Sequence, residues 1–108
     1  MYEIDISLYN DTYKLFCKTL LNHEGIPESE QTYDKDLTVI FKVGSVPIGF
    51  MTYRIQDFFW VIHFVIDDKY RKDTIRGVLK FLRAIPKTHG FVTFIIGLPD
   101  NKHKLNKL

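Results

Sequence analysis

Two strongly apolar segments on either side of an amphipathic helical pattern are the feature that most constrains the fold of this sequence. The segments cover 58–66 and 91–97, and each is apolar at almost every position. Strands that are apolar on both faces are typical of the covered centre of a sheet. Between them, a polar turn over 67–72 precedes a helical pattern over 73–85, which Pro86 is expected to end. The sequence therefore predicts a β-α-β unit, with two parallel strands joined by a right-handed crossover.

The residues before this unit predict three more strands. Residues 1–7 alternate apolar and polar side chains, which is the period of a half-buried strand. The same alternation occurs over 37–43, and a further strand pattern follows over 48–55. Gly44-Ser45 lies between these two segments and suits a tight hairpin turn. Together with the first apolar run, they predict a three-stranded meander.

Two further helices complete the predicted order. A single apolar stripe predicts a helix over 11–22, and the acidic segment after it predicts a loop with a short helical turn around 28–32. A last helix is predicted to begin near Asn101. The order β-α-β-β-β-α-β-α defines an α/β (α+β) class with a mixed sheet, in a single domain over 1–108.

Composition excludes two classes of protein. Hydrophobic residues make up 45% of the chain and charged residues 26%, which is typical of a folded globule and not of a disordered chain. The longest apolar run is far shorter than the roughly 20 residues that span a bilayer. The acidic N-terminus has no basic leader, and the lone Cys17 cannot form an internal disulfide. We therefore expect a cytoplasmic protein.

The net charge of +2 conceals an uneven distribution. Residues 1–36 hold three lysines and eight acids, a net −5, whereas residues 37–108 hold twelve bases and five acids, a net +7. Five of these bases recur at helical spacing on one face of the predicted third helix: Lys72, Arg76, Lys80, Arg83 and Lys87. This stripe predicts an anionic partner, either a phosphate backbone or an acidic protein, and a solvated helix face is the other interpretation.

The β-α-β unit also predicts where a ligand binds. In open α/β sheets, ligands bind beyond the carboxyl ends of parallel strands, which here is the turn between Ile66 and Thr74. The helix N-terminus that follows favours an anion. Elsewhere, Cys17 lies on an apolar stripe and is expected to be a core thiol. The four histidines lack the spacing of a metal site, so no metal is expected.

Four segments, taken together, resemble the GNAT (Gcn5-related N-acetyltransferase) superfamily. They are the hairpin over 39–49, the strand that ends at Ile66, the segment over 70–79, and Asn101. The resemblance covers most of the chain in order and spacing. It implies a GNAT-like mixed sheet with a central parallel pair of strands, here without the closing C-terminal strands, and acetyl-CoA as the cofactor.

The cofactor loop of that family reads Gln/Arg-x-x-Gly-x-Gly/Ala, and its backbone amides hold the pyrophosphate of acetyl-CoA. Arg71 matches the first position, but Thr74 and Arg76 occupy the two glycine-type positions. Glycine lets the backbone approach a phosphate without an intervening Cβ, so these replacements erode the loop and leave side chains as the alternative phosphate ligands. The resemblance implies cofactor contacts at Ile66, Arg71, Lys72, Asp73, Thr74, Ile75, Arg76 and Asn101.

The catalytic groups that the family commonly uses are mostly missing. A frequent general base is a carboxylate on the fourth strand, but residues 58–66 contain no acid, and His63 is their only ionisable side chain. His63 is either a candidate base or a hydrogen-bonded core residue. The tyrosine that commonly acts as general acid follows an asparagine like Asn101, but residues 102–108 contain no tyrosine.

These departures leave two functions open. One is a non-catalytic binding or accessory protein, which resembles small acetyltransferase-like proteins of bacteriophages, including virion-associated ones, in the host cytoplasm or the virion. Its exposed 91–97 edge strand predicts a homo-oligomer or another protein partner. The alternative is an acetyl-CoA-dependent N-acetyltransferase acting on an amine, with a backbone amide near Phe64 or Val65 stabilising the oxyanion and His63 or water as base.

Overall fold

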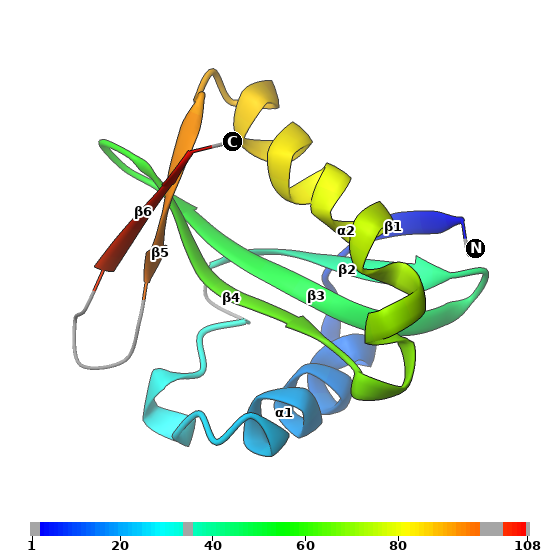
Figure 1. The fold of residues 1–108 in the computed structure, drawn as a ribbon. Helices are drawn as coiled ribbons and strands as arrows, with labels where there is room; N and C mark the ends of the chain where they lie inside the picture. The colour runs from blue at the N-terminus through cyan, green and yellow to red at the C-terminus, as the bar shows by residue number, and fades with distance from the viewer. Residues whose placement is uncertain (1–2, 34–35, 98–102, 108) are drawn as a thin grey trace.

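Six strands form one sheet, in the order β1-β2-β3-β4-β5-β6, in a computed structural model that describes residues 3–33, 36–97 and 103–107 (Figure 1). Neighbouring strands are antiparallel except β4 and β5, which are parallel and connected through α2. The strands are β1 (Ile4–Leu8), β2 (Leu37–Val43), β3 (Val46–Ile55), β4 (Phe59–Ile66), β5 (Thr93–Gly97) and β6 (His103–Lys107). The predicted β-α-β unit, the meander and the mixed α/β (α+β) class are confirmed.

One helix covers each face of the sheet (Figure 1). Helix α1 (Lys14–His23) follows a 3-10 turn, η1 (Asp11–Tyr13), and a second 3-10 turn, η2 (Glu28–Glu30), lies in the loop after α1. Helix α2 (Asp68–Thr88) crosses the other face. Within the described ranges, none of the helices is long and apolar enough to span a bilayer.

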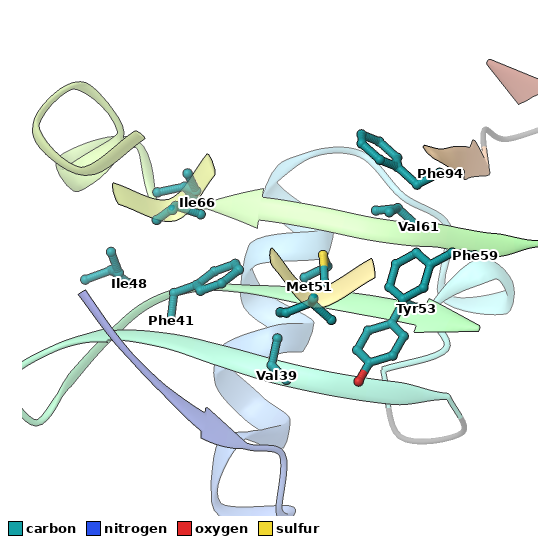
Figure 2. Packing of buried hydrophobic residues seen from close by; sticks show 11 residues of the cluster. Val39, Phe41, Ile48, Met51, Tyr53, Phe59, Val61, Ile66 and Phe94 are labelled. Carbon is teal, nitrogen blue, oxygen red and sulfur yellow. The ribbon is translucent and has the colours of Figure 1, made fainter. Parts of the chain in front are cut away.

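Two buried clusters hold the helices on the sheet. The α2 cluster lies between α2 and the sheet, and Figure 2 shows the side chains that β2, β3, β4 and β5 contribute to it. Its buried members are Val39, Phe41, Ile48, Met51, Tyr53, Phe59, Val61, Ile66, Val78, Ile85 and Phe94. The α1 cluster, on the opposite face, consists of Cys17, Leu20, Leu21, Tyr33, Ile40, Phe50 and Val65. Because β4 contributes to both clusters, its sequence is apolar on both faces.

A β-bulge in β4 decides which of its side chains face which helix. The register between β3 and β4 shifts after Thr52 and leaves Ile62 as an extra residue. A bulge of this kind reverses the alternation of side chains along the strand. Val61 therefore belongs to the α2 cluster, whereas His63 lies against Phe50 of the α1 cluster, with their ring centroids 6.3 Å apart.

The described chain ends in a strand and not in a helix. Residues His103–Lys107 form β6, which runs antiparallel to β5 along all of Thr93–Gly97. The prediction of a final helix is therefore wrong, and one closing strand expected to be missing is present. Pairing with β6 satisfies the outer backbone groups of β5, a gain that a short local helix cannot match. Pairing also removes the exposed β5 edge on which the predicted oligomer or protein partner depended.

Helix α2 extends beyond both of its predicted ends. It begins at Asp68, within the predicted turn, because Asp67 caps it: Oδ1 of Asp67 accepts the N–H of Lys69 at 3.1 Å. It continues past Pro86 to Thr88, because the φ angle of proline suits a helix and only one N–H is lost near the end. The early start places the predicted ligand turn inside the helix.

Candidate functional site

The parallel strands β4 and β5 pair over a short stretch and then diverge (Figure 1). Trp60 is paired with Ile95, and Val61 with Ile96. β4 continues to Ile66, so within the described residues its edge beyond Val61 has no strand partner on the β5 side. The carboxyl end of β4 therefore presents backbone groups at the place where the sequence predicts a ligand.

A single residue, Asp67, separates β4 from α2. Its N–H donates to the carbonyl of Ile48 at 2.7 Å, and its carbonyl accepts the N–H groups of Tyr70 and Arg71 at 2.9 and 3.1 Å. Its side-chain Oδ1 accepts a hydrogen bond from the N–H of Lys69. Because the amides of Lys69, Tyr70 and Arg71 are already bonded, an anion at this helix N-terminus would meet the carboxylate of Asp67.

Arg71 belongs to an ionic cluster at the same place. Its Nη2 lies 3.1 Å from Oε1 of Glu24 and 2.9 Å from Oδ1 of Asp68, and it donates to the carbonyl of Ile66 at 3.2 Å. Nε2 of His23 lies 3.0 Å from Oδ2 of Asp68. Since His23 and Glu24 stand at the C-terminal end of α1, the cluster joins that end to the start of α2. Arg71 therefore holds the two helices together through its Nη2.

The predicted phosphate-binding side chains do not converge. Helix positions five apart are separated by about 140° around the axis, so Arg71 and Arg76 point to different sides of α2. Lys72, Asp73 and Arg76 are exposed, and Arg76 lies with Lys72 on the outer side of the helix. Arg71 therefore cannot share one phosphate with Lys72 and Arg76.

The other predicted cofactor residues serve packing. Thr74 is 1% exposed, and its hydroxyl donates to the carbonyl of Tyr70 at 2.6 Å. Ile75 packs against the α2 cluster, and Ile66 is part of it. Asn101 lies outside the described residues.

Acetyl-CoA does not fit this junction in the way that the resemblance implies. A pyrophosphate site needs several free N–H groups that point at one place, but residues 71–76 lie inside a helix, where each N–H bonds to the carbonyl four residues earlier. The carboxylates of Asp67, Asp68 and Glu24 outnumber the Arg71 guanidinium that pairs with two of them, and the excess negative charge at the helix N-terminus repels an anion. The junction therefore contains no pyrophosphate-binding loop.

His63 occupies a buried position beneath the loop that follows η2. It is 7% exposed, and its Nε2 lies 3.4 Å from the backbone N of Thr32. Burial lowers the pKa of His63 below its ordinary value of 6.5, although a hydrogen bond with the backbone of Glu30 and the charge of Asp36 oppose this shift. The two hydrogen-bond partners are the last residue of η2 and a residue just after it, so the imidazole ties this part of the chain to the sheet. These contacts favour the core interpretation of His63 over the general base.

The buried imidazole makes the stability of the protein depend on pH. Below pH 6.5 the unfolded chain takes up a proton at His63 that the folded protein resists, so the free energy of unfolding falls as the pH drops from about 7 towards 5. The slope contributed by this residue is at most about 1.4 kcal/mol per pH unit. Urea unfolding of the wild type and of His63→Gln at both pH values measures it. If His63→Gln loses as much stability as the wild type over this range, the assignment is wrong.

The remaining nucleophile and ligand candidates are structural. Cys17 is fully buried in the α1 cluster, and burial raises the pKa of its thiol to about 12, so the reactive thiolate does not form near neutral pH. Among the residues that the structure describes, no group of three His, Cys, Asp or Glu side chains is placed to hold a metal ion.

A shallow hollow of about 280 Å³ lies at the opposite end of the sheet from the β4–α2 junction, and its lining includes Leu37, Tyr53 and Ile55. Arg54 also lines it, but its guanidinium makes two hydrogen bonds, of 2.9 and 3.0 Å, to the carboxylate of Asp36. The charged groups of this hollow therefore neutralise each other, and the hollow offers no free charge to a ligand.

Sequence reasoning missed two features that shape the junction, the early start of α2 and the ionic cluster. The signal for the helix start was present: Asp67 has the chemistry of an N-cap, and no glycine or proline follows until Gly77. The cluster had no such signal. Glu24 and Arg71 are 47 positions apart, and only the tertiary fold brings them together.

The strand order, the parallel β4–β5 pair and the helix between them define the fold of the GNAT acetyltransferases. An acetyltransferase of the GNAT family from Staphylococcus aureus Mu50 has a similar structure, with a TM-score of 0.65 and 15% sequence identity over 91% of this chain and 74% of that one. An aminoglycoside 6'-acetyltransferase type Ii is also similar, with a TM-score of 0.63 and 19% identity over 92% of this chain and 76% of that one. No protein-family model and no curated protein matches the sequence.

Proposed function

We propose that this protein is a binding protein with a GNAT fold and without acetyltransferase activity. The observation that carries the proposal is the start of α2 directly after Asp67, which replaces a phosphate-binding loop by a capped helix. The GNAT neighbours are acetyltransferases by their descriptions, and such enzymes must hold the acidic acetyl-CoA. Bonded amides and three carboxylates at the helix start oppose that step.

The missing catalytic groups support the same proposal. β4 carries no carboxylate, and its ionisable residue His63 is buried against a loop. A general base must reach the proton that it removes, and a group with partners in a packed loop does not. A virion-associated setting, which the resemblance to bacteriophage proteins implies, is a further part of this proposal. The arguments from the fold and from the missing catalytic groups do not depend on this setting.

Titration with acetyl-CoA tests the proposed function. We expect no heat in calorimetry and no rise in melting temperature at millimolar ligand. A ligand present at 100 times its Kd would stabilise the folded state by about 2.7 kcal/mol, which is several degrees for a chain of this size. An aminoglycoside 6'-acetyltransferase measured in parallel is the positive control. Saturable binding at micromolar acetyl-CoA would overturn the proposal.

One observation favours the alternative, an acetyl-CoA-dependent N-acetyltransferase acting on an amine. The strands β4 and β5 diverge after Val61 and Ile96, and this leaves the β4 backbone near Phe64 and Val65 without a strand partner on the β5 side among the described residues, although both residues pair with β3 on the other side. A backbone N–H there could stabilise an oxyanion. Release of free CoA from acetyl-CoA in the presence of an amine would establish this activity. Its absence, together with absent binding, removes the alternative.

A further inference from the structure

The exposed face of α2 carries a row of positive charges that the proposed function does not explain. Its members are Lys72, Arg76, Lys80, Arg83 and Lys87, all of which are exposed in the structure. At about 100° per residue they fall within an arc of about 80°, opposite the buried residues Val78 and Ile85. The row, here called the α2 stripe, extends for about 22 Å along the helix.

The charges of the α2 stripe are uncompensated within the described part of the chain. None of its five side chains makes an ion pair with another described residue, whereas cations elsewhere do: Lys18 with Glu28, Arg54 with Asp36, and Arg71 with Glu24 and Asp68. Asp73 is the one acid on the exposed side of α2 after its first turn. Five like charges on one helix face repel one another, and no described acidic side chain pairs with them. An anionic partner would therefore lower this electrostatic repulsion.

The straight, regular arrangement of the α2 stripe indicates which kind of anion it binds. A straight, evenly spaced row matches a polymer with evenly spaced charges, and a nucleic-acid duplex presents one phosphate charge per about 1.7 Å of its axis. No aromatic side chain is among the exposed residues of α2, so the stacking platform that single strands require is missing. The apolar side of α2 is buried on the sheet and is not free to enter a lipid interface.

We propose that the α2 stripe binds the phosphate backbone of double-stranded nucleic acid without reading its sequence. The inference names a partner for the proposed binding function and rests on that function for its biological meaning. The physical evidence for it, however, comes from α2 alone. The acetyl-CoA titration and the duplex titration therefore test the two proposals independently. If the protein binds both ligands, the non-catalytic proposal is refuted and the proposal for the α2 stripe is supported.

Fluorescence anisotropy with a labelled DNA duplex of roughly 20 base pairs tests the inference at salt concentrations between about 50 and 200 mM. If all five contacts form, log K should fall with log salt with a slope of about −4.5, and two unrelated duplex sequences should bind equally. The triple variant Arg76→Gln, Lys80→Gln and Arg83→Gln should make the slope shallower by about 3 and weaken binding by roughly two orders of magnitude at low salt.

A matched triple variant separates the stripe from overall charge. Lys14→Gln, Lys18→Gln and Lys42→Gln remove the same three charges from α1 and β2, and should leave the affinity and the salt slope nearly unchanged. Circular dichroism establishes that both triple variants remain folded. Absence of binding at low salt, or equal losses in the two variants, overturns the inference. Tighter binding of single-stranded DNA, of an acidic peptide or of anionic vesicles than of the duplex also overturns it.

Discussion

Replacing Phe41 by alanine lowers the free energy of unfolding by about 3–5 kcal/mol. Phe41 in β2 is fully buried, and its ring contacts those of Phe64 and Phe81, with centroids 5.9 and 6.0 Å away. Phe81 belongs to α2 and Phe64 to β4, so the Phe41 side chain links β2 to the helix and to a second strand of the sheet. Truncation removes apolar contact and leaves a cavity that a sheet paired on both sides of β2 cannot close.

Urea unfolding followed by the fluorescence of Trp60, the single tryptophan, measures this loss. Phe58→Ala is the matched control, because the Phe58 side chain is 52% exposed and its truncation should cost less than about 1 kcal/mol. Total stabilities are about 5–15 kcal/mol, so Phe41→Ala should be close to unfolded at room temperature if the wild type lies at the low end. Equal costs for the two substitutions would contradict the packing described for β2.

Replacing Gly49 by alanine is expected to destabilise the protein by about 3 kcal/mol, at the upper end of the usual overpacking cost. Gly49 in β3 pairs with Ile66 at the end of β4. A Cβ at this position would lie 2.5 Å from the carbonyl oxygen of Val65 and 3.0 Å from Cα of Ile66. These are backbone atoms, and β4 cannot withdraw because the N–H of Asp67 is bonded to the carbonyl of Ile48.

The control for Gly49→Ala is Gly44→Asn in the turn between β2 and β3. Gly44 has a φ of +61°, a conformation that asparagine tolerates, and an added Cβ would meet no atom within 4 Å. This change should cost about 1 kcal/mol or less. Both variants are compared by urea unfolding at neutral pH. A stability of Gly49→Ala within about 0.5 kcal/mol of the wild type would show that β3 and β4 are not so close.

The sheet could be predicted from the sequence because its signals are local. Residues 37–43 alternate apolar and polar side chains, and 58–66 and 91–97 are apolar throughout most of their length, which identifies strands without reference to the rest of the chain. The amphipathic pattern of α2 likewise separates its buried side from the α2 stripe. These patterns were sufficient for the class of fold, and the structural similarity to GNAT acetyltransferases agrees with them.

The last strand could not be predicted in the same way. His103–Lys107 is short, and its sequence alone does not favour a strand over a helix. Its structure depends on the unpaired edge of β5, which lies beside it only after the chain has folded. Strand propensity of this kind reflects the neighbouring strand more than the residues themselves.

The candidate site could be predicted from the sequence even less well than the last strand. The resemblance to the GNAT cofactor-loop motif implied that Arg71, Thr74 and Arg76 lie in one phosphate-binding loop. In the folded protein α2 directs Arg71 to Glu24, Thr74 into the sheet and Arg76 to solvent. Likewise, the bulge at Ile62 turned His63 towards the α1 side. Helical geometry distributes neighbouring residues around an axis, so adjacency in sequence did not become a shared site.

The sequence by itself determined the β-α-β unit, the apolar faces of its strands and the positive face of α2, since each follows from the spacing of residue types along one element. Only the tertiary structure decided what Arg71 contacts, which carbonyl accepts the N–H of Asp67 and what covers β5. Those outcomes depend on atoms contributed by distant segments: Glu24 at the end of α1, Ile48 in β3 and the strand β6. Such contacts have no trace in local pattern, because they exist only once long-range packing has brought the elements together.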